Sequence, residues 1–334
     1  AESWVEIAEF GKKKLELLRR FRPFENGTPS HDQLGDLFAA LDAEAFQRCF
    51  IAWVGSLAKL GPDIVAIDGK TLRRAYQEGG GKAPIHMISA WSSRQHLVLG
   101  QAKVAEKSNE ITAIPALLER IDLKGSLVSI DAMGCNPDIA QAILDAGADY
   151  LLAVKDNQPT LHAEIKSYFD TAPQSEVKRS KTTEKEHGRL EIRDHAVSHN
   201  LDWYGTARSY PGAPRFPHIA TIGMVRSHIE RGGKIESEQR SYISSRLLTA
   251  QAFADGVRNH WAIENNLHWN LDVTFGEDQS RLRAGHGARN MAVVRHFAIN
   301  LVRQVKDKRS LKRRRKRASW DPEYLFQILG PLRR

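Results

Sequence analysis

The chain has 334 residues, of which 41% are hydrophobic and 27% are charged, which is typical of a globular protein. Two cysteines, Cys49 and Cys135, exclude a disulfide framework and fit a reducing, cytoplasmic setting. No apolar run approaches the roughly 18–20 residues needed to span a bilayer, and no leader peptide is expected. We therefore expect neither a membrane protein nor a secreted one.

The positive charge of the chain is concentrated near its C-terminus. The net charge is +9, and the stretch from Arg303 to Arg317 contains ten basic residues and one acid, Asp307. Such a run either forms a solvated, disordered tail or binds a polyanion through the release of counterions. We favour a polyanion and assign residues 306–334 as a basic C-terminal tail. The residues of this tail that we expect to contact phosphates are Arg313, Arg314 and Arg315.

Residues 1–60 are expected to form a helical N-terminal domain. Apolar residues recur there at three- and four-residue spacings, and Ser30 and Gln33 have the spacing of a capping box. Asp42 is placed to cap the next helix. Short helices joined by tight turns are typical both of a DNA-reading helix-turn-helix and of a packing domain, and both interpretations remain open.

From residue 61 onward the pattern becomes that of an α/β domain. Apolar runs and helical segments follow one another in the order β-β-β-α-β-α-β, which predicts a mixed sheet with helices on its faces. The predicted strands are 64–67, 85–91, 97–104, 127–130 and 150–155, and the predicted helices are 109–121 and 136–148. Residues 171–249 are polar with short strand-like runs and are expected to be a β-rich insertion. Helical periodicity returns over residues 250–305.

Two of the predicted strands end in aspartate in the same way, at Asp68 in VAIDGK and at Asp131 in VSIDAMG. Functional carboxylates gather where strands of a sheet stop, although an aspartate after a strand also commonly begins a turn. If the two strands are neighbours, the carboxylates lie close enough to share hard divalent cations. The pair is therefore a candidate metal site.

A third acid stands in the helical segment HWAIENNLHWNLD. His260, Glu264 and His268 are four residues apart and rise along one helix face. This segment has three interpretations. It forms a zinc site, although the HExxH arrangement is absent; or it contributes Glu264 to an acidic trio with Asp68 and Asp131; or it is a plain amphipathic helix. In the last case the side chains expected to pack against the core are Trp261, Leu267, Trp269 and Leu271.

The motifs AIDGKTLR, SIDAMGCN, LLAVKDNQP, HGRLEIRDHAV, YISS and HWAIENNLHWNLDVTFGED follow one another in this order. Together they resemble the DDE-type insertion-sequence transposases of the H-repeat-associated group, over nearly the whole chain. The resemblance implies an α/β, ribonuclease H-like catalytic domain over residues 61–170 and 250–305, interrupted by the β-rich insertion at 171–249. It places the three catalytic acids on Asp68, Asp131 and Glu264.

The resemblance also implies the reaction. A DNA transposase of this kind cleaves the ends of an insertion sequence and transfers them to target DNA, with two Mg²⁺ or Mn²⁺ ions held by the three carboxylates and no covalent enzyme intermediate. The expected partners are terminal inverted repeats, target DNA and a second copy of the chain. The expected location is the bacterial cytoplasm, at the nucleoid.

Further side chains are expected to contact DNA around the three acids. They are Lys70 and Arg73 after the first acid, Lys155, Asn157 and Gln158 after the fifth strand, His187, Arg189 and Arg193 on one strand face, and Asn265 and His268 beside Glu264. For those at strand ends the alternative is a solvated strand-end role, and for Asn265 and His268 it is to orient Glu264. The arginines 281, 283, 289 and 295 add positive charge. For Trp203 we favour a hydrophobic plug over stacking on an unpaired base.

Two features depart from the family pattern. Related transposases with a β-rich insertion carry a Tyr-Arg-Glu-Lys signature, but the corresponding positions around Glu264 are Val257, His260 and Leu271. The Arg and Lys roles of that signature therefore do not transfer. The chain also opens on Ala1 inside the helical region, so we expect a preceding segment of some tens of residues. A catalytically silent DNA-binding relative and a simple nuclease of the same fold are the alternative functions.

Overall fold

The computed structural model describes residues 3–57, 61–76, 84–104, 110–186, 189–206, 216–231 and 234–333. The chain divides into two compact units. Unit 1 consists of Ala1–Lys59, Gly69–Lys107 and Glu264–Arg334, and unit 2 consists of Leu60–Asp68 and Ser108–Ile263. Strand β1 (Ile64–Tyr76) begins in unit 2 and continues in unit 1.

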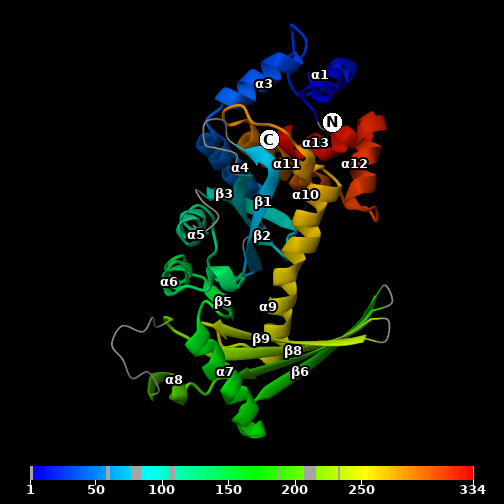
Figure 1. The fold of residues 1–334 in the computed structure, drawn as a ribbon. Coiled ribbons are helices and arrows are strands. Elements are labelled where there is room, and N and C mark those ends of the chain that lie inside the picture. The colour runs from blue at the N-terminus through cyan, green and yellow to red at the C-terminus, as the bar shows by residue number, and fades with distance from the viewer. Residues whose placement is uncertain are drawn as a thin grey trace. The chain divides into compact units, whose positions relative to one another are not determined.

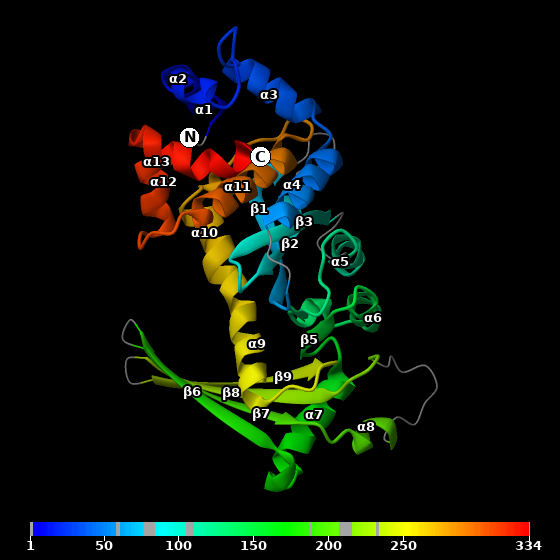
Figure 2. The ribbon, with the colours of Figure 1, turned by 180° about the vertical axis from the view of Figure 1, so that it is seen from behind.

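Unit 2 is a mixed sheet with helices on its faces. Its strands are β4 (Leu127–Ile130), β5 (Asp149–Val154), β6 (Lys178–Glu186), β7 (Arg189–Ser198), β8 (Thr221–Arg231) and β9 (Lys234–Ser244). Its helices are α5 (Glu110–Leu118), η2 (Ala132–Gly134), α6 (Pro137–Asp145), α7 (Pro159–Thr171), η3 (Gln174–Glu176), α8 (Asp202–Thr206) and α9 (Ala250–Ile263). Helices α7 and α9 lie on opposite faces of strands β6 to β9 (Figures 1 and 2).

The strand order in unit 2 is β1-β4-β5-β9-β8-β7-β6. The first half of β1 pairs with β4, and β4 pairs with β5, in parallel. Strand β9 then joins β5 in antiparallel fashion, and β6 to β9 form an antiparallel meander. The predicted β-rich segment 171–249 therefore extends the same sheet. The parallel strands β4 and β5 are mostly apolar and largely buried, as expected for strands that are covered on both faces.

Helix α9 is fixed on the sheet by close packing. Its Phe253 and Val257 belong to a buried apolar cluster with Leu127 and Leu151 of the sheet. A Cβ added to Gly256 of α9 would lie 2.7 Å from a methyl of Leu151, so glycine lets the helix approach these strands.

Unit 1 contains the remaining helices of the described residues. They are α1 (Trp4–Lys13), α2 (Leu15–Arg19), α3 (His31–Ala40), α4 (Ala43–Leu57), η4 (Glu264–His268), α10 (Trp269–Val273), η5 (Glu277–Gln279), α11 (Gly287–Gln304), α12 (Leu311–Trp320), α13 (Pro322–Leu329) and η6 (Gly330–Arg333). Strands β2 (Pro84–Ser92) and β3 (Leu97–Val104) pair in antiparallel fashion, and β2 lies next to β1.

The N-terminal helices begin where the sequence predicts. The side chain of Ser30 accepts a hydrogen bond from the backbone of Gln33, whose side chain bonds back, so the capping box is confirmed. Asp42 accepts from the backbone N–H groups of Glu44 and Ala45 and caps α4. The helical pattern at the start of the chain is interrupted at Lys14, between α1 and α2.

Helix α11 forms the buried centre of unit 1. The amide of Asn300 donates to Val98 O and accepts from Val98 N, both at 2.9 Å, and so bonds the helix to β3. The amide of Asn290 donates to Phe38 O and Leu41 O, each at 2.8 Å, and so bonds the helix to the end of α3. Through these bonds the two amides hold α11 against β3 and the end of α3, with their donor groups paired to backbone carbonyls.

The expected mixed α/β architecture is confirmed. The residues assigned to the basic C-terminal tail form the folded helices α12 and α13 instead of the disordered tail considered for them. Among the helices of the described ranges, none is both long enough and apolar enough to cross a membrane.

Candidate active site

Asp68 and Asp131 stand at equivalent positions of neighbouring parallel strands. Ile67 of β1 is the Cα partner of Ile130 of β4, and each isoleucine directly precedes one of the acids. Paired strands lie about 4.8 Å apart, so the two carboxyl groups start from adjacent backbone positions. Both side chains are half-buried. The condition for a shared cation, that the two strands are neighbours, is therefore met.

The carboxylate of Asp131 is held by the backbone that follows it. Its Oδ1 atom accepts from the N–H groups of Met133 at 3.0 Å and Gly134 at 3.3 Å, and so caps η2. Burial raises the pKa of Asp131, and the nearby Glu110 raises it further. These effects outweigh the two backbone donors and the charge of Lys155. The negative charge of Asp131 is thus incompletely compensated, a condition that a bound cation relieves.

The turn after Asp131 is clamped by residues predicted to contact DNA. The amide of Asn157 donates to Ala132 O at 2.5 Å and to Cys135 O at 3.1 Å, and Gln158 donates to Cys135 O at 3.2 Å. These side chains therefore support the backbone that orients Asp131. Lys155 remains exposed.

Helix α9 crosses β4 near its carboxyl end. Nδ1 of His260 lies 3.2 Å from the hydroxyl of Ser129, two residues before Asp131. Burial lowers the pKa of His260 to about 4, so this imidazole is neutral near pH 7. His260 is one of the three side chains in the zinc interpretation, and its Nδ1 is engaged by Ser129.

The segment that carries Glu264 is the π-helix η4, which continues directly from α9. Single π-turns inside α-helices are frequent at functional sites. The Glu264 side chain is 60% exposed, whereas that of His268 is 7% exposed, and His268 Nδ1 lies 4.0 Å from Glu264 Oε2. Asn265 is exposed. The π-turn thus directs Glu264 outward while His268 stays inside.

The packing expected for an amphipathic helix is only partly found. Leu267 and Leu271 are buried, but Trp261 is 45% and Trp269 is 53% exposed, so the predicted core packing of these tryptophans is wrong. Trp261 instead lies under the Arg240 guanidinium, 4.5 Å from the ring centroid. Since a π-turn holds more residues than an α-turn, positions on either side of η4 do not keep one common face.

Lys70 and Arg73 lie in an acidic cluster of unit 1. Nζ of Lys70 is 2.7 Å from Asp272, 3.2 Å from Glu277 and 3.3 Å from Asp278. The Lys70 side chain is 10% exposed, so its charge is directed to these carboxylates. Arg73 is exposed and lies 3.3 Å from Asp278.

The basic residues predicted on the β-rich segment are only partly described. His187 and the side chain of Arg189 lie outside the described residues. Arg193 pairs with Glu191 at 2.7 Å and lies 3.5 Å from Glu184.

Trp203 lies in an aromatic group of unit 2. Its ring stacks on Tyr168 at 5.9 Å between ring centroids, and its Nε1 donates to Asn200 O.

Several other arginines form internal contacts. Arg289 pairs with Glu44, and Arg295 lies 3.4 Å from the buried Glu277. In α12, Arg314 and Arg315 bond to neighbouring backbone and side chains, whereas Arg313 is exposed. Positive charge counted along the sequence therefore overstates the charge that is available to a ligand.

Sequence reasoning missed the acids around Lys70. Asp272, Glu277 and Asp278 all lie in the recognised string LDVTFGED, and this was the only signal for them. The positions that replace the family's Tyr and Lys, Val257 and Leu271, are both buried apolar side chains.

The Transposase DDE domain family matches residues 59–301, which is more than half of the chain. The chain belongs to this family. A companion family, DDE_Tnp_1-associated, matches residues 1–54. As a Transposase DDE domain, the protein has a ribonuclease H-like fold, in agreement with its large mixed sheet and flanking helices.

Individual relatives agree with the family. The chain is 39% identical to YhhI, an H repeat-associated protein of Escherichia coli strain K12, over 99% of this chain and 88% of that protein. It is 40% identical to YncI of Escherichia coli O157:H7, over 99% of this chain and 85% of that protein. Both relatives carry names that refer to transposases. The resemblance to the H-repeat-associated group is confirmed.

A more distant similarity is found among solved structures. A piggyBac transposase in a synaptic complex with hairpin DNA matches 99% of this chain and 72% of its own, at 11% identity and a TM-score of 0.42.

Proposed function

We propose that this transposase DDE domain protein cleaves DNA at the ends of an insertion sequence and transfers those ends to target DNA. The proposed catalytic residues are Asp68, Asp131 and Glu264. Family membership supports the class of reaction. The assignment of the individual catalytic residues is supported by the way α9 packs along β4.

The register of α9 on β4 carries this proposal. Gly256 packs against Leu127, and one turn later His260 bonds to Ser129. Four helical residues advance by about 6 Å, and two strand residues advance by nearly the same distance, about 6.6 Å. Asp68 and Asp131 are neighbours across the sheet. We propose that Glu264, four residues beyond His260, supplies the third carboxylate.

The donor set fits a hard divalent cation. Three carboxylates offer only oxygen ligands, which Mg²⁺ and Mn²⁺ prefer, and two ions per site are proposed. The raised pKa of Asp131 supports this fit, because a carboxylate buried beside Glu110 is stabilised by added positive charge. When bound, such ions supply charge stabilisation and an activated nucleophile for phosphodiester cleavage.

The protein's own side chains orient this site. The backbone donors of Met133 and Gly134 fix one oxygen of Asp131, and Asn157 fixes the turn that carries them. Since the attacking group is water or a DNA 3′-hydroxyl, no protein nucleophile is required.

The proposed DNA contacts surround this site. The exposed Lys155 and Asn265 are proposed to face DNA. His187 and Arg189, whose side chains lie outside the described residues, and Arg193 stay proposed DNA contacts of the β-rich segment. The buried His268 is proposed to orient Glu264 instead. For Lys70 and Arg73, pairing with carboxylates of unit 1 supports a structural role there rather than the binding of phosphate. Two element ends must be paired, so we propose at least a homodimer acting on chromosomal DNA at the nucleoid.

Labelled DNA carrying the ends that flank the protein's own gene tests the proposal. With Mg²⁺ or Mn²⁺ the wild type should cut at those ends, and Asp131→Asn and Glu264→Gln should bind the DNA without cutting it. Asp138→Asn and Glu236→Gln, which change exposed acids elsewhere in unit 2, are the matched controls and should cut normally.

Two other outcomes point to other functions. Cutting without joining in a strand-transfer assay would indicate a simple nuclease. Tight binding with no cutting by the wild type would indicate a DNA-binding relative, and cutting that survives both site substitutions would refute the residue assignment.

A further inference from the structure

Helix α12 divides its basic residues between two faces. It contains six Lys and Arg residues and no acid in ten positions. At 100° per residue, the exposed side chains share one face. They are Lys312, Arg313, Lys316, Ser319 and Trp320. The opposite face carries Arg314 and the buried Ala318, which packs in an apolar cluster with Val302 and Tyr324.

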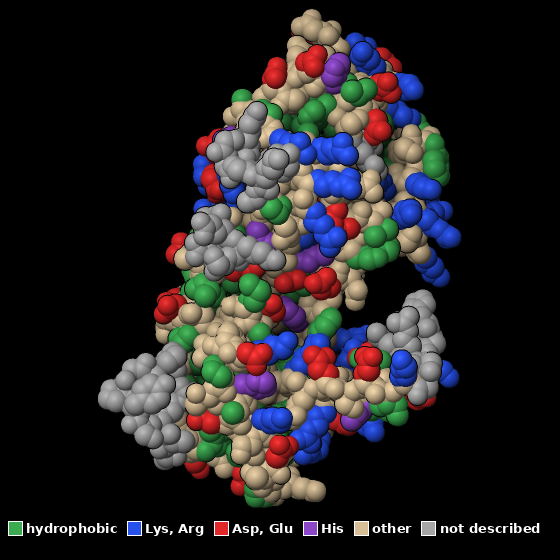
Figure 3. All heavy atoms as spheres, viewed as in Figure 1, with side chains coloured by type: hydrophobic (Ala, Val, Ile, Leu, Met, Phe, Trp, Pro, Cys, Tyr) green, Lys and Arg blue, Asp and Glu red, His purple; other side chains and the backbone are tan. Residues whose placement is uncertain are grey.

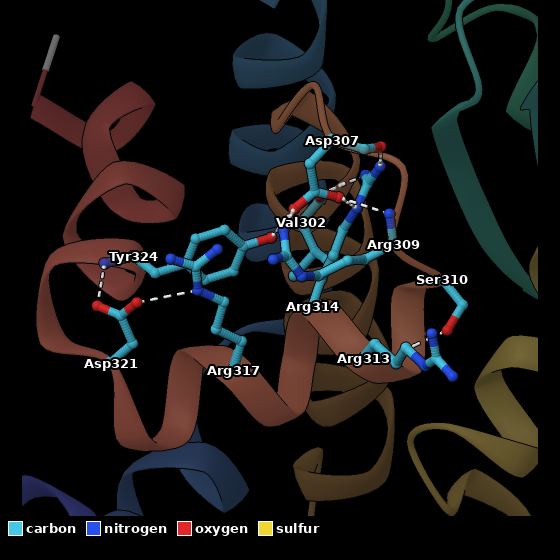
Figure 4. Close-up of polar contacts among 9 residues, drawn as sticks. All are labelled: Val302, Asp307, Arg309, Ser310, Arg313, Arg314, Arg317, Asp321 and Tyr324. Carbon is cyan, nitrogen blue, oxygen red and sulfur yellow. Dashed lines mark hydrogen bonds and ion pairs between the residues drawn. The ribbon is translucent and has the colours of Figure 1, made fainter.

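Asp307 anchors the inner face. Arg314 Nε donates to its carboxylate at 2.7 Å, and Tyr324 and Arg309 donate to the same group (Figure 4). Partial burial acts to raise the pKa of Asp307, but donors from Arg309, Tyr324 and Arg314 hold that pKa well below its usual range. The one acid of the basic run is therefore ionised and directed inward.

Two more arginines serve as inner contacts. Arg317 pairs with Asp321 at 2.9 Å and lies over the Tyr324 ring. Arg315 donates to the carbonyl of Thr274. Half of the six basic side chains of α12 thus hold the helix in place.

The outer face is left without compensating charge. Across the ranges that the structure describes, no ion pair involves Lys312, Arg313 or Lys316. Figure 4 shows Arg313 directed away from Asp307, and Lys and Arg side chains gather at the place of α12 on the molecular surface (Figure 3). Trp320, which is 66% exposed, lies on the same face.

This arrangement is unfavourable for an isolated helix. Lys312 and Lys316 are like charges four residues apart, and Lys312 and Arg313 stand in the first turn, where the helix dipole is positive. Local conflicts of this kind are expected at functional sites, where a ligand supplies the missing interaction. The missing interaction here is negative charge along a face of about two turns.

We propose that the outer face of α12, formed by Lys312, Arg313, Lys316 and Trp320, is a preorganised docking surface for the phosphate backbone of duplex DNA. The proposal rests on the proposed function, because that function makes DNA the polyanion. It assigns binding to the outer residues and an anchoring role to Arg314, Arg315 and Arg317. The contact is independent of base sequence, since lysine and arginine on phosphates carry no sequence information.

The salt dependence of DNA binding tests this assignment. The triple variant Lys312→Gln, Arg313→Gln, Lys316→Gln is compared with the matched variant Lys124→Gln, Lys166→Gln, Lys178→Gln, which removes the same charge from exposed positions of unit 2. The probe is a short duplex of arbitrary sequence, titrated over a range of salt concentrations. Each lost phosphate contact lowers the slope of log K against log salt by about 0.9, so the α12 variant should lose about 2–3 from the slope.

The outcomes separate this proposal from the proposed function. The proposal is supported if the slope falls in the α12 variant only, with a thermal midpoint no lower than that of the wild type. An equal fall in both variants would mean that net charge alone matters, and an unchanged slope in the α12 variant would also overturn the proposal. Glu264→Gln should keep the wild-type slope while losing cleavage, so failure of the catalytic assignment is visible independently.

Discussion

Replacing Lys70 by methionine removes the ammonium group at the centre of three carboxylates while keeping the apolar stem. That group lies between 2.7 and 3.3 Å from Asp272, Glu277 and Asp278. The Glu277 side chain is 2% exposed, so it cannot replace the lost partner with bulk water. Its remaining cation is Arg295, at 3.4 Å.

The expected loss of stability follows from this burial. Removing one partner of a buried ion pair costs about 3–5 kcal/mol, because the other charge is left uncompensated. Arg73→Met is the matched control, since it removes a cation that is 80% exposed and lies 3.3 Å from Asp278. An exposed pair contributes about 0–1 kcal/mol.

The pKa of Lys70 also shows that attraction to the three carboxylates outweighs the cost of burying its charge. Burial acts to lower this pKa, but Glu277, Asp272 and Asp278 raise it above its ordinary value. A raised lysine pKa means that the stabilisation is fully present at neutral pH and is lost as the pH rises through the pKa of the folded state.

Urea unfolding at pH 7, followed by tryptophan fluorescence, measures these free energies. Lys70→Met should lose several times more stability than Arg73→Met. In a double-mutant cycle with Glu277→Gln, the two changes should be non-additive by more than 1 kcal/mol. Equal effects of the two cations, or strict additivity in the cycle, would refute the account of Lys70 as the centre of a buried cluster.

Three further predictions concern other parts of the chain. Asn157→Ala should lower stability by about 1–3 kcal/mol, because Asn157 bonds two carbonyl groups after Asp131, whereas Asn265→Ala, at an exposed position, should have little effect in the same urea assay. Iodoacetamide followed by peptide mapping should label the exposed Cys49 and leave Cys135 unmodified, since burial raises the pKa of Cys135 to about 12; equal labelling would contradict its burial. Burial also lowers the pKa of His296 to about 3. Below about pH 6.5 the imidazole therefore binds a proton in the unfolded state but not in the folded state. The free energy of unfolding should then fall with acidification by up to about 1.4 kcal/mol per pH unit. His296→Gln should reduce this slope, and an unchanged slope would contradict the assignment.

Much of the fold follows from local patterns in the sequence. The run LVLGQAKV was predicted as a strand over 97–104 and forms β3 over the same residues, because its apolar, β-branched side chains suit a covered sheet. Strand β6 was not predicted, since KRSKTTEKE is almost entirely polar. It lies at the end of the sheet, where charged residues prevent pairing with other chains.

The candidate site was only partly predictable. Asp68 and Asp131 could be found because each directly follows an apolar strand run, and parallel neighbours bring such positions together. The partners of Lys70 could not be found by pattern, because they lie about two hundred residues further along the chain and read as surface acids. The π-turn at Glu264 could not be predicted either, because His260, Glu264 and His268 have the four-residue spacing of an ordinary α-helix.

The claim that three distant acids form one cation site is tested most directly by Mn²⁺ binding, measured from the free Mn²⁺ signal in electron paramagnetic resonance. The account predicts that Asp68→Asn, Asp131→Asn and Glu264→Gln each weaken binding strongly, while Glu236→Gln binds as the wild type does. Wild-type Mn²⁺ affinity in Glu264→Gln, with loss in the two aspartate variants, would contradict the account, because Glu264 would then lie outside the site.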